Sequence, residues 1–450
     1  MPDAVPLGRE AALKMKGQLS RLALPEDQYL AWRATLNREG LTSLRLAGVE
    51  VKGLKRVNPD YVQDQLHNLK PGKEVTPAEI IQDTSRIYAL GDFERVSYQL
   101  IGPPDARTLE ITPVEKSWGP NFVHFDLGLA ANGDGSLDAL GRVDTNRTWV
   151  NSLGAEWHNA LQLGVQTLAE TDFYQPIDVV QRYFIQPTAM YERDLEDIYN
   201  DGDRIATYLI SQLFAEFDAG LNLGTRAQAR VGLRSGWYKA EVDTGPTVLP
   251  TNPKEVDTSM QMRVVYDTRN SVGMATSGTF LNARLVSSGA WLGGEQDYGL
   301  AEGVIVKAFP FRGDALNLIL GGGKELHGTL PATEEFQLGG VRTFPGLQRG
   351  ELRGDAYWFA GSSYFWKVAD IQSLFGQALY AGLRLQAGRM GDRIDQVNDG
   401  ALYGASTSLG GNSPVGPFIL SLGYVDNGSW QLQFAVGRPV PEGSILDEIR

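Results

Sequence analysis

The chain has 450 residues and a net charge of −13, which argues against nucleic acid as a partner and leaves room for several domains or one large barrel. It contains no cysteine, so disulfides, thiolate metal sites and thiol catalysis are excluded. No segment approaches the ~18 apolar residues of a membrane-spanning helix, whereas a β-barrel needs only alternate apolar residues.

Residues 1–40 are predicted to be helical, because leucines recur among Lys, Arg, Gln and Ala before a break at Pro25. The first residues lack the basic and apolar regions of a secretory signal. A chain that is exported needs such a signal, so we expect the natural protein to begin further upstream. We interpret this segment as the tail of a missing N-terminal domain or as a helical linker.

Residues 41–116 are predicted to form a compact β-α-α-β-β unit. An Asn-Pro pair at 58–59 starts the first helix, and residues 76–79 form a capping box with proline at the first helical position. Apolar residues recur at helical spacing within both helices. Gly91 then turns the chain into the last two strands, which end at Glu115. A generic α+β domain is the competing interpretation.

Residues 121–439 are predicted to form a mainly β structure, a transmembrane barrel of about sixteen antiparallel strands. Apolar residues alternate with Gln, Arg, Asp or Gly, for example over 123–130, 379–386 and 430–437. This alternation is typical of strands with one face toward lipid and the other toward a lumen, although a soluble β-sandwich alternates too. Residues 440–450 are predicted to be a C-terminal tail.

A glycine-rich segment with one arginine interrupts the strands in the connection between about 314–328 and 353–367. Its central residues are Gly340, Val341, Arg342, Thr343 and Phe344. We expect the segment to fold back into the lumen, because glycines let a backbone pass close to the wall and a guanidinium holds a carboxylate well. The possible partners of Arg342 are Glu351, Asp355 and Gln386. Support of the barrel and a role in gating are both open for Arg342.

No catalytic, metal or cofactor site is predicted. The four histidines, His67, His124, His158 and His327, have no metal-ligand spacing. No serine has glycine at both the second position before it and the second after it, so the nucleophile elbow of lipases is missing.

The first and last predicted strands are expected to close the barrel at a seam. The residues that we assign to this seam are Phe125, Leu127, Phe434, Gly437 and Pro439. Proline cannot donate a backbone hydrogen bond, so the pairing is expected to be weak near Pro439. A weak seam is able to open and pair with a client strand.

Two of these segments resemble known families. The loop segment resembles the Val-Arg-Gly-Phe/Tyr motif of the BamA/TpsB superfamily, outer-membrane barrels that insert or translocate other polypeptides, with Thr343 at the usual glycine. Members usually carry an aspartate where Gln386 stands. Residues 41–116 resemble a POTRA domain through the motif Gly91-x-Phe93-x-x-Val96. Such modules bind client segments by strand addition.

One POTRA-like unit before sixteen strands resembles the patatin-like phospholipase autotransporters of type V secretion subclass d (PlpD-like). The resemblance implies a Gram-negative-type outer-membrane translocator, with the POTRA-like domain in the periplasm, that exports a fused N-terminal phospholipase passenger to the cell surface. Outer-membrane lipids, the passenger and barrel-assembly machinery are the implied partners, and the oligomeric state is open. The hydrolase residues would lie in the passenger. A static anchor and an outer-membrane protein assembly factor are the alternatives.

Overall fold

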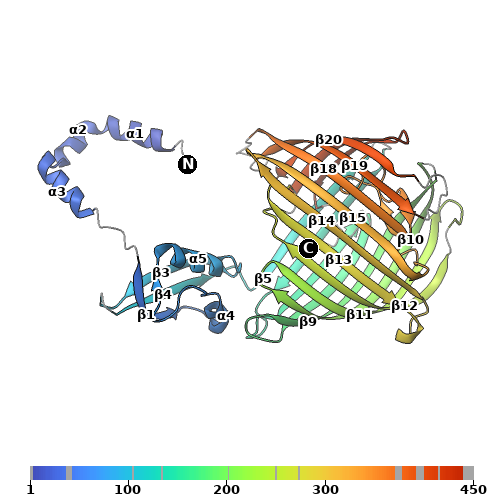
Figure 1. Ribbon diagram of the computed structural model, residues 1–450, viewed down its shortest axis with the longest axis horizontal. Helices are drawn as coiled ribbons and strands as arrows, with labels where there is room; N and C mark the ends of the chain where they lie inside the picture. Colours follow the sequence, from blue (N-terminus) through green and yellow to red (C-terminus); the bar gives the residue numbers. More distant parts are fainter. Residues whose placement is uncertain are drawn as a thin grey trace. The chain divides into compact units, whose positions relative to one another are not determined.

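The computed structural model describes residues 4–36, 43–103, 106–132, 135–200, 202–248, 251–271, 274–369, 378–391, 400–413 and 416–438 (Figure 1). The chain divides into two compact units. The first comprises Met1–Leu54 and Val62–Val114, and the second comprises Lys55–Tyr61 and Glu115–Arg450.

The N-terminal segment is helical up to Leu36. It contains α1 (Ala4–Lys14), α2 (Lys16–Leu19), a 3-10 turn (Ser20–Leu22) and α3 (Glu26–Leu36). The chain leaves helical geometry before Pro25, as the sequence suggests, because the residue that precedes a proline disfavours helical dihedrals. Within the described ranges, no helix has the length and apolar character that are needed to cross a membrane.

A small mixed β/α domain follows, built on a four-stranded sheet with the order β2-β1-β4-β3. Its elements are β1 (Leu44–Val51), α4 (Pro59–Asp64), β2 (Glu74–Val75), α5 (Pro77–Tyr88), β3 (Phe93–Ile101) and β4 (Arg107–Glu115). The predicted capping box is present, since the Thr76 side chain accepts from the Glu79 amide and the Glu79 carboxylate accepts from the Thr76 amide. The two-residue strand β2 was not expected, and α4 is shorter than its apolar pattern suggested.

The core of this domain lies between the sheet and the helices. It contains Leu46, Val62, Leu66, Leu69, Val75, Ile80, Ile87, Phe93, Leu109 and Ile111, all at most 5% exposed. Gly91 adopts a φ of 86°, the left-handed region that glycine enters at no steric cost, and turns the chain into β3. Phe93 is buried and Val96 is half-buried on that strand.

Glu115, at the end of β4, holds the turn that follows β1. Its carboxylate accepts hydrogen bonds from three consecutive backbone amides at 2.7–3.1 Å, those of Lys55, Arg56 and Val57. Burial, the largest single effect, raises the pKa of Glu115, but these amides and the Arg56 guanidinium outweigh it and the pKa lies below its usual value.

Sixteen antiparallel strands close into a barrel (Figure 1). They are β5 (Asn121–Ala131), β6 (Leu137–Arg147), β7 (Glu156–Gly164), β8 (Gln166–Pro176), β9 (Tyr183–Asn200), β10 (Asp203–Leu223), β11 (Ala227–Thr244), β12 (Asn252–Asp267), β13 (Gly278–Ser288), β14 (Tyr298–Phe311), β15 (Asp314–Gly328), β18 (Ala356–Ala369), β19 (Leu379–Gly391), β20 (Leu402–Ser413), β21 (Gly416–Val425) and β22 (Trp430–Gly437). Neighbours in sequence are neighbours in space, and β22 returns to pair with β5. The predicted fold class is confirmed.

The alternation of the sequence sets the two faces of each strand. On β5, Val123, Phe125 and Leu127 point outward and are 53%, 76% and 66% exposed, as lipid-facing residues of a barrel are. On β22, Trp430, Leu432 and Phe434 alternate with Gln431 and Gln433, and Gln433 is only 6% exposed on the inner face. A soluble sandwich would bury the apolar face instead.

Candidate functional site: the lumen loop and the barrel seam

The loop 329–355 leaves the barrel at β15 and returns at β18, the eleventh-to-twelfth connection where the sequence placed it. It contains a short hairpin of β16 (Phe336–Leu338) and β17 (Leu352–Gly354). The hairpin explains why β18 begins at Ala356, three residues after the predicted start of that strand.

One end of the loop is bound to β9. Arg353 pairs with Glu196 of β9 and, at 3.1 Å, with Glu335 of the loop itself. Arg349 donates to the main-chain oxygen of Leu195 at 3.1 Å. Tyr199 of β9 donates to the Gln348 side chain at 3.0 Å. The bonds of the two arginines are charge-assisted, and together with the tyrosine they hold this part of the loop against β9.

The central motif is bound to β19. The Arg384 guanidinium donates to the main-chain oxygens of Arg342 and Thr343 at 3.0 and 2.6 Å. Two positions further along the same inner face, Gln386 donates to the main-chain oxygen of Pro345 at 2.7 Å. In the ring of sixteen strands β9 and β19 stand eight places apart. A loop that is bonded to both therefore crosses the lumen.

A third attachment joins the loop to β11 and β13. Glu334 is 5% exposed and pairs with Arg234 at 2.5 Å and with Arg284 at 3.2 Å. Each arginine has a second carboxylate on the neighbouring strand, Asp257 for Arg234 and Glu302 for Arg284. Because every charge here has an opposite partner, this buried cluster avoids the cost of an uncompensated ion.

Glycines in the wall make room for the loop. A Cβ on Gly423 of β21 would lie 2.5 Å from the main chain of Pro345 and Gly346. A Cβ on Gly388 of β19 would lie 3.0 Å from the Phe344 ring. Phe344 has no exposed surface and belongs to the apolar cluster inside the barrel. The sequence anticipated this close approach of backbone and wall.

Thr343 stands where the resembled motif usually has glycine, and its side chain is used. The hydroxyl donates to the Gly339 oxygen at 2.7 Å and accepts from the Gly339 amide at 3.2 Å. The Phe344 amide donates to the Gly340 oxygen at 3.1 Å. Thr343 is 1% exposed, and its hydroxyl thus closes the tight turn of the motif.

The structure places the predicted partners of Arg342 around the loop. Glu351 accepts from the Gln348 amide at 2.7 Å. The main-chain oxygen of Asp355 accepts from the Glu325 amide at 2.8 Å. Gln386 contacts the loop through Pro345. A pairing of the Arg342 side chain with any of the three stays a prediction.

Sequence reasoning missed the wall residues that hold the loop. Arg384, Glu196, Arg234 and Arg284 all occupy polar positions of alternating strands. This pattern signals a lumen-facing side chain. It does not say which segment that side chain meets.

The seam between β22 and β5 is short. Among the described residues it consists of four pairs, from Phe434 opposite Ala131 to Gly437 opposite Gly128. The neighbouring pairings β21–β22 and β5–β6 have seven and eleven pairs. Gly437 has a φ of 83°. Pro439, on which the prediction of weak pairing rested, lies outside the described residues.

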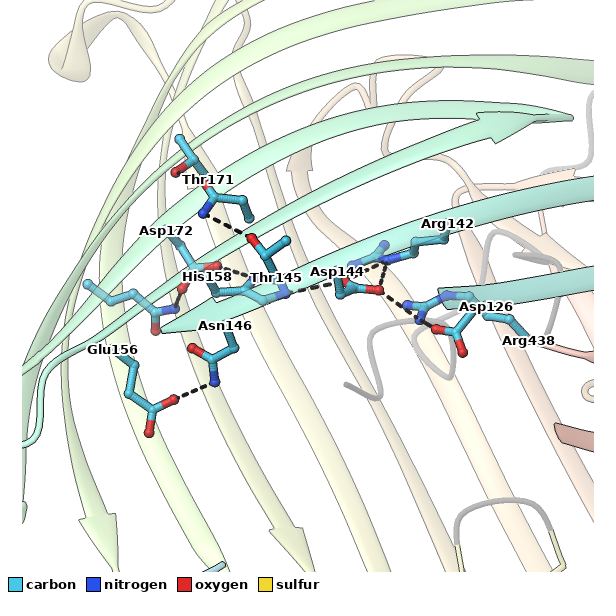
Figure 2. Close-up of polar contacts among 12 residues, drawn as sticks. Asp126, Arg142, Asp144, Thr145, Asn146, Glu156, His158, Thr171, Asp172 and Arg438 are labelled. Atoms are coloured by element: carbon cyan, nitrogen blue, oxygen red, sulfur yellow. Dashed lines mark hydrogen bonds and ion pairs between the residues drawn. The ribbon is translucent and has the colours of Figure 1, made fainter. Parts of the chain in front are cut away.

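A chain of polar side chains runs along the inner wall beside the seam (Figure 2). Arg438 pairs with Asp126 of β5 at 3.0 Å. Asp144 of β6 accepts from Arg142 at 2.7 Å and lies 3.2 Å from the imidazole Nε2 of His158. The members of the chain are Arg438, Asp126, Asp144, Arg142, His158 and Asp172, drawn from the last strand end and from β5 to β8.

His158 also meets acidic groups that sequence spacing does not reveal. Asp172 lies 2.8 Å from its Nδ1. A ring nitrogen of His158 and one carboxylate oxygen each of Glu170 and Asp172 all lie within 4.8 Å of one another. Both ring nitrogens already contact carboxylates, so the histidine is part of the wall network.

Comparison with protein families decides the classification. The model of the Omp85 superfamily domain matches residues 151–438. The chain belongs to the Omp85 superfamily. It is therefore an outer-membrane β-barrel of the Gram-negative type with a POTRA-like N-terminal region. No curated protein matches the sequence.

Solved structures share this architecture at low sequence identity. BamA from Haemophilus ducreyi lacking POTRA domains 1-3 is 14% identical, with a TM-score of 0.64 over 88% of this chain and 84% of that one. CdiB from Escherichia coli is 14% identical, with a TM-score of 0.56 over 88% and 76%. CdiB from Acinetobacter baumannii is 13% identical, with a TM-score of 0.55 over 90% and 80%. These likenesses show the fold.

Proposed function

We propose that this Omp85 barrel is a translocator that passes a polypeptide through the outer membrane. Its cargo would be a fused N-terminal patatin-like phospholipase passenger, which the barrel exports to the cell surface. The observation that supports this most is the four-pair seam between β22 and β5, because a short seam costs little to open. The hydrolase activity belongs to the passenger, and this chain acts only in transport.

The seam offers a template for a client strand. Among the described residues, β22 pairs with the last four residues of β5, and the Arg438 amide adds one bond to the Leu127 oxygen at 2.8 Å. When β22 separates, the backbone groups of β5 become an unpaired edge. An unpaired edge accepts an extended segment, as in strand addition.

The lumen loop would control the interior of the barrel. Its motif around Arg342 is bonded to β19, and its hairpin is bonded to β9. Release of either attachment changes what blocks the lumen without unfolding the strands.

In this scheme the POTRA-like domain receives the passenger in the periplasm, and one of its sheet edges is the binding surface.

A static anchor is the competing function. The observation that favours it is the attachment of the loop to three separate parts of the wall. A barrel that only holds a surface enzyme needs neither a mobile loop nor a seam that opens.

The test joins a folded reporter and an export signal to the N-terminus and measures whether external protease reaches the reporter. Ala130→Cys with Ala435→Cys places thiols on directly opposed residues of the seam, and the chain has no other cysteine. The control, Ser421→Cys with Gln433→Cys, joins directly opposed residues of β21 and β22. A gel-mobility assay confirms that each barrel is folded.

We expect the seam disulfide to block display of the reporter, a reducing agent to restore it, and the control disulfide to leave it unchanged. Arg342→Ala, run beside them, is expected to reduce display while the barrel stays folded. Display that persists with the seam locked contradicts the seam route. Failure of the unlocked, folded barrel to display the reporter contradicts the translocator itself.

A further inference from the structure

We propose that Arg438, Asp126 and Asp144 form an ionic latch that holds the barrel seam closed. The latch goes beyond the proposed translocation, since it names the contact that regulates the seam of that same route. Its existence is measurable on the purified barrel without any client.

A single residue at the end of the last strand reaches the first two strands. The Arg438 amide donates to the Leu127 oxygen at 2.8 Å. One nitrogen of its guanidinium lies 3.0 Å from a carboxylate oxygen of Asp126 on β5 and 3.9 Å from one of Asp144 on β6. Figure 2 shows the guanidinium between these two carboxylates.

Arg438 extends the seam by one contact beyond its last residue pair. The described pairing ends at Gly437 opposite Gly128, so Arg438 adds the next contact at that end. A Cβ on Gly128 would lie 2.4 Å from the Arg438 oxygen. Glycine is therefore needed opposite the latch, and its absence of a side chain lets the Arg438 backbone approach β5.

Asp144 is held in place by residues that are not part of the seam. It accepts from Arg142 on its own strand at 2.7 Å and contacts His158 of β7 at 3.2 Å. His158 in turn contacts Asp172 of β8 at 2.8 Å, and Gln186 of β9 donates to Asp172 at 2.8 Å. The carboxylate that faces Arg438 is thus fixed to four consecutive strands.

This arrangement makes the latch selective for the closed state. Opening the seam moves Arg438 away, while the wall network keeps both Arg142 and His158 on Asp144. Asp126 forms an ion pair with Arg438, so opening leaves this lumen carboxylate without that cation. The contacts of Arg438 with Asp126 and Asp144 are therefore lost together when Arg438 moves away from β5 and β6.

The strength of the latch follows from its exposure. The side chains of Arg438 and Asp126 are 31% and 40% exposed, and that of Asp144 is 15% exposed. A partly exposed ion pair shifts an equilibrium by no more than about fivefold. Salt screens exposed charges over a Debye length of about 8 Å at physiological ionic strength, so the contribution decreases as salt is added.

The experiment measures deuterium uptake at the seam of the purified full chain in lipid nanodiscs. Peptides that cover 127–131 and 434–438 report the seam, and peptides from β10 and β11 report a distant part of the barrel. Arg438→Gln removes the charge. Arg230→Gln is the matched control, because Arg230 pairs with Asp218 at 3.3 Å across strands that are joined by long pairing.

We expect Arg438→Gln to raise seam exchange by up to about fivefold at low salt, with a smaller rise at high salt and no change at β10 and β11. Arg230→Gln is expected to leave the seam unchanged. The exchanged pair Arg438→Asp with Asp126→Arg is expected to restore part of the slow exchange, since opposite charges again face each other at positions 126 and 438, while Arg142 stands directly opposite position 126. Restoration by a reversed pair requires an ionic contact rather than mere packing.

Two results would overturn the latch. One is a rate of seam exchange that Arg438→Gln leaves unchanged at low salt. The other is a rise of seam exchange in the Arg230→Gln control that equals the rise in Arg438→Gln. The proposed function fails separately. If the latch variants behave as expected and the seam disulfide still allows export, the latch stands and the seam route falls.

Discussion

The close approach of β21 to the lumen loop predicts a large effect from one methyl group. In Gly423→Ala the new Cβ would lie 2.5 Å from the Gly346 nitrogen and the Pro345 carbonyl carbon. That distance is about 1 Å short of an ordinary contact of roughly 3.5 Å. Both neighbours are backbone atoms, so the loop itself must move or the strand must bend.

We expect the substitution to lower the free energy of unfolding by about 1–3 kcal/mol, the usual cost of overpacking a filled interior. The same change at Gly303 of β14 is the control, because its Cβ would meet nothing closer than 3.6 Å. There the effect should stay within about 0.5 kcal/mol. In both variants alanine lowers the conformational entropy of the unfolded chain, which stabilises the protein equally. The difference between their free energies of unfolding therefore reports the steric contact of the new methyl group at position 423.

The assay is urea unfolding in lipid vesicles, followed by the fluorescence of the nine tryptophans, together with trypsin cleavage at the loop arginines. Gly423→Ala should shift the midpoint to lower urea at an unchanged slope, and the loop should be cut faster. Equal midpoints and equal cleavage for the two variants would refute the close contact between β21 and the loop.

Two further predictions test the loop and the small domain. Arg384→Gln removes two charge-assisted bonds to the loop backbone and should cost roughly 1.5–3 kcal/mol, with faster cleavage at Arg342. Stability is measured by thermal unfolding. Cleavage at Arg342 that is no faster in the variant would show that the loop is held elsewhere. The depressed pKa of Glu115 contributes stability that is present above its unfolded pKa of about 4.3 and is lost as the pH falls through the lower folded pKa. Acid titration of the turn at 55–57, measured by hydrogen exchange, should show this loss in the native chain and not in Glu115→Gln.

Several features of the small domain and the barrel were readable from neighbouring residues. The capping box at 76–79 depends on two side chains three residues apart, and it forms as predicted. Outward exposure of Phe125 and Leu127 follows from alternation alone. The short strand β2 escaped, since two residues carry no periodicity.

The candidate site was predictable only in part. The glycines and Arg342 marked 339–346 as a loop that meets the wall, and the structure brings that loop to β19 and β21. One residue that holds it, Arg384, was visible as a lumen-facing arginine but had no assigned partner. The seam residue Arg438 was not singled out, because its carboxylate on β5 lies at the other end of the barrel sequence.

The sequence by itself determined the class of this protein. Alternation, turn clusters and helix caps act over two to four residues, so they specify strands, their faces and the helix starts of the small domain. Tertiary structure decided the partners. Closing sixteen strands in one register puts β9 opposite β19 and returns β22 to β5. Arg353 thereby meets Glu196, and Arg438 meets Asp126, 312 positions away. The physical reason is that ring closure, unlike periodicity, fixes distances between residues that the chain does not connect locally.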